Sequence, residues 1–166
     1  MWTYWPNVQG TSKTSVRKKK TFFIASKNKN KEVECIGTGN KEDPFIIENI
    51  NMEDYDKFYD IRIYNNRTHL KLLKSNLKEL GLFDSKYITV EEYDNLKYCI
   101  LKYCSEVNLR NIKTKLLKFG DCTDVTIENS TINQIKLYKG SEGTITLKNC
   151  SVNKIDKKVA DKIKII

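Results

Sequence analysis

Three short segments, Val107-Asn108-Leu109, Val125-Thr126-Ile127 and Ile145-Thr146-Leu147, decide the fold of this sequence. Each alternates apolar and polar residues, which is the pattern of a β-strand with one buried face. Two segments of the same kind precede them, Leu70-Lys71-Leu72 and Ile88-Thr89-Val90. The five segments begin 18, 19, 18 and 20 positions apart, a period too short for two-helix repeats, whose units run to about 33 residues or more. We therefore predict a solenoid of short coils made of strands and tight turns.

The last three segments share an asparagine at the same place in the coil. Counted from the first apolar residue, the fifth position is Asn111, Asn129 and Asn149 in turn. Equivalent residues of stacked parallel strands lie above one another, about 4.8 Å apart. Asparagine tolerates the left-handed backbone of a sharp corner, and stacked asparagine amides can bond to one another. We therefore predict a structural asparagine ladder at one corner, with Cys104 and Cys122 as small members of another column.

A leucine-rich-repeat horseshoe is the main alternative at this period, but its LxxLxLxxN pattern is approached only once, at 104–112. The stretch 37–50, GTGNKEDPFIIENI, has a glycine-rich turn, Asp-Pro-aromatic and then Ile-Ile-Glu. It resembles the opening of right-handed parallel β-helix repeat proteins of the pectate-lyase-like superfamily, and the later coils are similar too. The resemblance covers about residues 36–154 and implies an all-β fold, a short right-handed parallel β-helix of about five to six coils. It implies almost nothing about activity, because the superfamily includes lyases, hydrolases, epimerases, adhesins and scaffolds.

Two other segments flank the predicted β-helix. Residues 1–35 form a basic, aromatic-containing N-terminal tail, in which 21–25 (TFFIA) is a candidate capping strand. Residues 155–166 are a candidate C-terminal cap, as a short amphipathic helix or, failing that, a final strand. Three apolar residues of this cap lie at helical spacing: Ile155, Val159 and Ile163. Such caps would cover the apolar edges that an open solenoid exposes.

Positive charge is concentrated at the N-terminus. Of the formal net charge of +9, the first 40 residues contribute +6 and the remaining 126 residues +3. Aromatic residues followed by a basic cluster suit base stacking with phosphate contacts, so we predict that the tail binds a polyanion (RNA, DNA or a ribonucleoprotein) or a protein assembly. The alternatives are a tail whose charge only aids solubility and aromatic side chains that pack on the solenoid. The candidate binding residues are Trp2, Tyr4, Trp5, Lys13, Arg17, Lys18, Lys19 and Lys20.

Cysteine usage and hydropathy indicate an intracellular chain. The five cysteines include no CxxC pair, which disfavours a disulfide framework or a zinc site and favours buried free thiols. The sequence has neither a run of about 18 apolar residues nor a signal-peptide pattern. We expect no cofactor and no metal, and an intracellular location with which a place in a virion is also compatible.

The sequence contains no set of residues that demands a reaction. His69 is the single histidine, and neither Gly-His-Gly nor Gly-x-Ser-x-Gly occurs. The acidic candidates are Glu91, Glu92 and Asp94 in one turn and Asp121 with Asp124 in another. They do not stack, because Arg110 lies where Glu91 would predict an acid. We therefore predict solvated turns and a chain that is not an enzyme.

Three functional hypotheses follow from these observations. The first is a non-enzymatic scaffold or interaction protein, a rigid β-helix anchored to a larger assembly (nucleic acid, ribonucleoprotein, or a viral or cellular protein shell) by its basic tail. The second is a carbohydrate-binding or carbohydrate-cleaving β-helix, in which the body lysines would meet an anionic glycan. The third is self-association through the coil edges.

Overall fold

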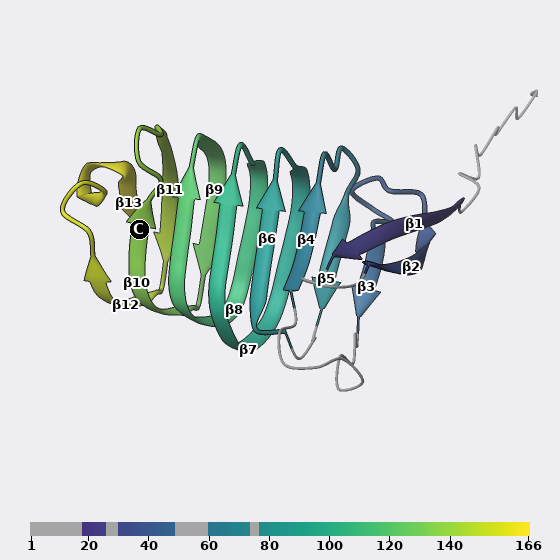
Figure 1. The fold of residues 1–166 in the computed structure, drawn as a ribbon, viewed down its shortest axis with the longest axis horizontal. Helices are drawn as coiled ribbons and strands as arrows, with labels where there is room; N and C mark the ends of the chain where they lie inside the picture. Colours follow the sequence, from purple (N-terminus) through teal and green to yellow (C-terminus); the bar gives the residue numbers. More distant parts are fainter. Residues whose placement is uncertain (1–17, 26–29, 49–59, 74–76) are drawn as a thin grey trace, which may run out of the picture.

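The computed structural model describes residues 18–25, 30–48, 60–73 and 77–166. It is an all-β parallel solenoid of about five turns with almost no helix, as predicted. The solenoid axis runs across Figure 1, with β1 and β2 at one end and β12 and β13 at the other. The elements are β1 (Lys18–Ala25), β2 (Asn30–Gly37), β3 (Phe45–Glu48), β4 (Asp60–Tyr64), β5 (Leu70–Leu73), β6 (Glu79–Phe83), β7 (Lys86–Lys102), β8 (Ser105–Gly120), β9 (Cys122–Glu128), β10 (Thr131–Leu137), β11 (Gly143–Lys148), β12 (Ser151–Ile155), the 3₁₀ turn η1 (Ala160–Lys162) and β13 (Ile163–Ile165).

The five segments that predict the fold lie side by side on one face of the solenoid. Their strands pair in parallel in the order β3-β5-β7-β8-β9-β11-β13. The first apolar residue of each segment pairs with the first of the next, so the register follows the sequence repeat. The column is Leu70, Ile88, Val107, Val125, Ile145 and finally Ile163.

A second face lies on the other side of the core. It is built from β4, β6, the second half of β7 and of β8, β10 and β12. Because β7 and β8 each run round a corner, the two longest strands contribute to both faces (Figure 1). Alternate side chains of both faces point inward and contribute to one continuous core of aliphatic residues, three aromatic residues (Phe45, Tyr93 and Phe119) and four buried cysteines. Burying apolar side chains in this way is the main favourable term in folding.

The corners between strands use the left-handed backbone region. Asn111, Asn129 and Asn149 have φ values of 51°, 49° and 48°, which confirms the predicted asparagine corner. Glu92 occupies the same corner one turn earlier, with φ of 63°. The side chains of the three asparagines are exposed, and among the described residues they make no hydrogen bond to one another. Their contribution is therefore backbone tolerance and not an amide ladder.

A small hydrogen-bond donor follows many of these corners. Ser85, Cys104 and Cys150 each donate to the carbonyl oxygen two residues earlier, at 2.8, 3.4 and 3.3 Å, and Cys122 and Ser130 do the same at 3.2 and 2.7 Å. A buried carbonyl without a partner would be costly. Serine and cysteine are small enough to fit at the corner, and each carries a side-chain donor for that carbonyl. The geometry of the coil therefore explains the cysteines at these positions. Cys104 and Cys122 are buried column members, as predicted.

The entry turn, residues 38–43, closes on itself between β2 and β3. Asp43 accepts hydrogen bonds from the backbone N–H groups of Thr38 and Gly39, at 3.1 and 3.0 Å, and its own N–H donates to the Asn40 side chain at 2.7 Å. Gly39 has φ of +72°, and a Cβ there would lie 2.5 Å from the Phe45 ring. The glycine-rich opening thus serves a tight turn that packs on the buried Phe45.

Both ends of the solenoid carry additional strands. β1 contains the segment 21–25, for which a capping strand is predicted, and pairs antiparallel with β2 beside the first turns. At the other end the amphipathic helix predicted for 155–166 is wrong and the alternative, a final strand, is confirmed. Ile155 belongs to β12 and Ile163 pairs with Ile145, because the edge of β11 still offers backbone groups that a strand can pair and a helix cannot. Ile165 is 72% exposed at this edge, where self-association stays a prediction.

The described residues contain no helix that is both long and apolar enough to cross a membrane.

Candidate functional site

Five outward side chains of alternating charge line the first face. We call this set the ion-pair ladder; its members are Lys71, Glu91, Arg110, Glu128 and Lys148. The Glu91 carboxylate lies 2.9 Å from Lys71 Nζ and 3.6 Å from Arg110 Nη1. The Glu128 carboxylate lies 3.1 Å from Arg110 Nε and 3.3 Å from Lys148 Nζ. Every charge in the ladder therefore has an opposite charge in a neighbouring turn.

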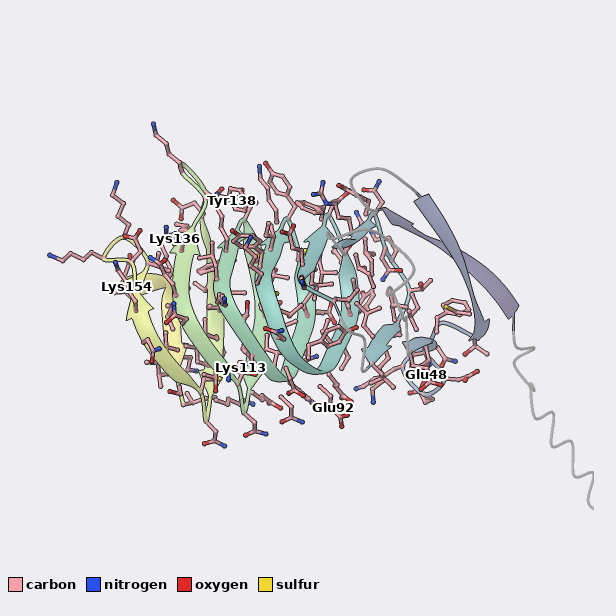
Figure 2. The ribbon with its side chains drawn as sticks, turned by 60° about the horizontal axis from the view of Figure 1, so that its bottom comes forward. Glu48, Glu92, Lys113, Lys136, Tyr138 and Lys154 are labelled. Atoms are coloured by element: carbon pink, nitrogen blue, oxygen red, sulfur yellow. The ribbon has the colours of Figure 1, made fainter. Side chains whose placement is uncertain are left out.

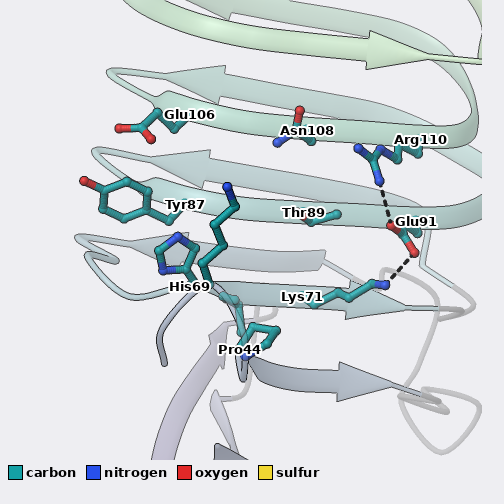
Figure 3. Close-up of a pocket in the computed structure, with 11 residues that line it drawn as sticks. Pro44, His69, Lys71, Tyr87, Thr89, Glu91, Glu106, Asn108 and Arg110 are labelled. Atoms are coloured by element: carbon teal, nitrogen blue, oxygen red, sulfur yellow. Dashed lines mark ion pairs between the residues drawn. The ribbon is translucent and has the colours of Figure 1, made fainter. Parts of the chain in front are cut away.

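A groove of about 440 Å³ lies beside the first half of this ladder (Figure 3). One wall is a stack of two rings, His69 on Tyr87, with ring centroids 4.7 Å apart and an interplanar angle of 23°. The backbone of His69 is held by the entry turn, because its N–H donates to the Gly39 carbonyl at 2.8 Å. The polar lining residues are Lys41, Lys71, Thr89, Glu91, Glu106, Asn108 and Arg110.

The acidic residues singled out by the sequence are not assembled in this groove. Glu92, Asp121 and Asp124 lie at left-handed backbone positions, with φ values of 63°, 53° and 52°, and none of them lines the groove. Glu91 corrects the prediction of a solvated turn: it lies within β7 and is held between two cations. A carboxylate engaged in two ion pairs is poorly placed to act as a general acid or base.

The second face has a different surface, which we call the lysine–aromatic face. It consists of the outward side chains of β4, β6, 98–102 of β7, 116–120 of β8, β10 and Tyr138. Two rows run along it in register. The first row is Tyr64, Phe83, Lys102, Gly120 and Tyr138, and the second is Arg62, Gly81, Ile100, Lys118 and Lys136.

Lysines of this face lie over aromatic rings. Lys118 Nζ is 3.9 Å and Lys102 Nζ is 5.3 Å from the centroid of the Tyr138 ring. Lys102 also lies 4.9 Å from the ring of Tyr103, which is 55% exposed. Figure 2 shows Tyr138 beside Lys136 on the later turns, with Lys154 beyond them. Burial raises the pKa of Tyr138, and the positive charge of Lys102 partly opposes this shift.

Gly120 explains how the two lysines reach one ring. It occupies the position between Lys102 and Tyr138 in the first row. A Cβ on Gly120 would lie 2.8 Å from Ser141 and 3.0 Å from the Tyr138 Cβ. The missing side chain therefore lets Tyr138 and the turn after it fold down onto the face, where the lysine side chains cover the ring.

The predicted tail residues fall largely outside the described part of the chain. Trp2, Tyr4, Trp5, Lys13 and Arg17 all lie there. The backbone of the other three, Lys18, Lys19 and Lys20, forms the start of β1. Binding of a partner by this segment stays a prediction.

Two thiols of the core, Cys99 and Cys104, are unreactive, whereas the side-chain hydrogen bond with Cys104 lowers the pKa of Cys122 to about 7. Burial raises the pKa of Cys99 to about 12, and the side-chain hydrogen bond with Cys122, together with burial, raises the pKa of Cys104. Both thiols therefore stay protonated near neutral pH, and a protonated thiol is a poor nucleophile or metal ligand. The part of the chain that the structure describes contains no group of three or more His, Cys, Asp or Glu side chains that could hold a metal ion.

Sequence reasoning missed both the ladder and the lysine–aromatic face. Four of its five members follow from one signal, the charge of the fourth residue of successive segments, which reads Glu91, Arg110, Glu128 and Lys148; Lys71 is the second residue of its segment. The second face gives a weaker signal. Its strands carry no repeated motif, and its rows become visible only when β6, β7 and β8 are aligned in register.

Comparisons with known proteins found no match: no family model fits the chain, and neither a curated protein nor a solved structure is significantly similar to it.

Proposed function

We propose that this protein is a non-enzymatic scaffold that attaches to a polyanionic component of a larger assembly. In this proposal the chain is a non-catalytic, right-handed β-helix similar to the pectate-lyase-like superfamily and acts inside the cell. Its rigid solenoid presents binding surfaces, and the basic tail at 1–35 adds to the attraction.

The observation that carries the proposal is the unequal distribution of charge between the two faces. Two acids of the first face, Glu91 and Glu128, are held in the ion-pair ladder. In the later turns of the second face, residues 98–102, 116–120 and 134–138 contain Lys102, Lys118 and Lys136 and no Asp or Glu, while Glu79 lies in the earlier strand β6. Clustered cations without acidic neighbours raise the local concentration of anions and steer polyanions to the surface.

Salt-dependent retention tests this proposal. The full chain is applied to heparin and poly(U) columns and eluted with a salt gradient, alongside a variant in which Arg17, Lys18, Lys19 and Lys20 are changed to Gln. We expect retention of the full chain on at least one of the columns and earlier elution of the variant. Flow-through of the full chain at about 50 mM salt on both columns would refute a polyanion partner.

Carbohydrate binding is the second candidate, favoured by the groove in the first face. Stacked rings beside a mixed set of donors and acceptors suit a sugar, which offers an apolar ring face and a rim of hydroxyl groups. Titration with an acidic oligosaccharide, oligogalacturonate, tests it. Tyr87→Ala should abolish binding, while Tyr103→Ala, which removes an exposed tyrosine elsewhere, should not. Cleavage lost on changing Glu91, Glu92, Asp121 or Asp124 to the amide would instead indicate an enzyme.

A further inference from the structure

We propose that the lysine–aromatic face is a binding track for single-stranded nucleic acid, with phosphates held by its lysines and bases stacked on its aromatic rings. This inference rests on the proposed function and names the surface and the class of polyanion. It differs from the tail prediction, because every residue that carries it lies in the described turns of the solenoid.

The lysines provide the first argument. Lys102 and Lys118 converge on the same Tyr138 ring, at 5.3 and 3.9 Å from its centroid, and Lys136 is the in-register neighbour of Lys118. No described acid forms an ion pair with any of the three. Like charges held close together repel one another, and the ring offsets this only in part. An anion placed between the ammonium groups would relieve the repulsion, so the geometry favours phosphate.

The aromatic rings provide the second argument. Tyr64 and Phe83 are stacked with centroids 5.0 Å apart at 15°, and Tyr64 is 55% exposed. A ring that lies open to solvent on a rigid strand is a platform for a nucleobase, because every base has a π-face. Cations and stacking rings on one surface are typical of proteins that bind single strands without reading a sequence.

A small hollow beside this stack provides the third argument. It has a volume of about 150 Å³, and its walls include Phe83, Ile100 and the charged residues Arg62 and Glu79. It opens next to Gly81, which has no side chain to fill it. The Phe83 ring suits a planar base, and Arg62 and Glu79 offer a donor and an acceptor to the edge of that base.

The dimensions of the face are those of a short track. The rows cross five strands from β4 to β10, so they extend over roughly 19 Å at about 4.8 Å per strand. The stacked rings lie toward the first turns and the lysine cluster toward the later ones. A nucleic-acid strand of a few nucleotides that lies along the solenoid axis would stack its bases at one end of the face and place its phosphates on the lysines at the other.

A charge-matched pair of variants tests the track in the full chain. Fluorescence anisotropy of a labelled 12-nucleotide oligo(U) is measured with Lys102, Lys118 and Lys136 changed to Gln, and with Lys157, Lys158 and Lys164 changed to Gln. Both triple variants lose the same charge. We expect the first to bind at least tenfold more weakly with a log–log salt slope reduced by about 2, at ~0.7 per phosphate contact. The second should stay within about threefold of the unchanged chain by the same relation.

Tyr64→Leu tests the assignment of nucleic acid as against any other polyanion, because leucine keeps the apolar bulk and removes the stacking ring. We expect weaker binding of oligo(U) and unchanged binding of heparin. If Tyr64→Leu binds oligo(U) as tightly as the unchanged chain, or if both triple variants weaken it equally, the track is refuted. If the track is refuted but the tail variant still binds more weakly, the proposed function is supported without the track. If the unchanged chain binds neither oligo(U) nor heparin, both the track and the proposed function are refuted. Circular dichroism of each variant confirms folding.

Discussion

The two faces of the solenoid are built by the same rule and end with opposite surfaces. In each, alternate residues point outward and stack in register on the turns before and after. On the first face the stacked residues alternate in charge, so Arg110 has an acid on both sides. On the second face Lys118 has Ile100 on one side and Lys136 on the other. In a stacked fold the charge order along a column thus decides whether a face stabilises itself or remains open to a partner.

The interiors behind the two faces differ much less. The inward positions of the first face are aliphatic throughout the five repeat segments, from Leu70 to Leu147. Those of the second face are also apolar and buried, but they include Phe119 and the thiol of Cys99. The comparison therefore predicts similar stability contributions from the two interiors and different responses to pH and salt.

The largest expected effect is loss of core volume behind the second face. Phe119 is completely buried, and Phe119→Ala should lower the free energy of unfolding by about 3–5 kcal/mol. Leu109→Ala, behind the first face, should cost about 2–5 kcal/mol. Urea denaturation of both variants measures this. If Phe119→Ala cost less than about 1 kcal/mol, a surface-like value, the second sheet would not share the common core and the comparison would fail.

The second effect is a loss of stability at alkaline pH to which the Cys99 thiol, behind the second face, contributes. The pKa of Cys99 is about 12 in the folded protein against 9.0 for an ordinary thiol. Below pH 9 both states keep the proton. Above it the unfolded state releases the proton first, so stability falls by up to about 1.4 kcal/mol per pH unit until the folded thiol also ionises.

Cys99→Ala isolates this contribution. Urea denaturation between about pH 8 and 10.5 should show a shallower decline for the variant than for the unchanged chain, although the cavity makes the variant less stable at pH 8. Parallel declines would show that the thiol is not protected by burial. A steeper decline in the variant would contradict the sign of the shift.

The sequence predicted the first face well because its signal is local and repeated. Apolar positions two residues apart recur about every 19 residues, and a left-handed corner follows each segment, at Asn111, Asn129 and Asn149. Backbone tolerance of asparagine is a property of one residue, so a sequence reveals it. The amide ladder was an inference about neighbouring side chains, and these point into solvent instead.

The sequence predicted the second face poorly because its neighbours are set by the register of whole turns. Lys102 and Tyr138 are 36 positions apart and meet because Gly120 between them has no side chain. Neither residue stands in a motif. The prediction of a helix at the C-terminal end failed for a related reason. Ile163 fits a helical spacing, but it pairs with the open edge of β11, and the periodicity of the sequence does not reveal that edge.

The third effect is smaller and belongs to the first face. Glu91 makes two ion pairs, so Glu91→Gln should lower the free energy of unfolding by about 0.5–1.5 kcal/mol at low salt. Because salt screens partly exposed pairs, the difference should shrink in about 1 M NaCl. Glu106→Gln is the control in the same groove, since Glu106 is exposed and has no ion pair in the described structure. A Glu91→Gln effect independent of salt would mean that packing and not charge explains it.

The smallest effect concerns the lysines of the second face. Because Lys102 and Lys118 lie on a ring and have no acidic partner among the described residues, Lys102→Ala should change the free energy of unfolding by no more than about 0.5–1 kcal/mol. It should nevertheless raise the pKa of Tyr138 further, since the charge of Lys102 favours the phenolate. NMR titration of the Tyr138 Cζ signal measures this, with Lys136→Ala as the control of equal charge. A lower pKa in Lys102→Ala, or an equal change in both variants, would show that Lys102 does not act on this ring directly. A rise in the Tyr138 pKa that is specific to Lys102→Ala, with stability nearly unchanged, would distinguish the two faces. On the second face the lysines would then be available to bind an anion, whereas on the first face the charges form ion pairs between neighbouring turns.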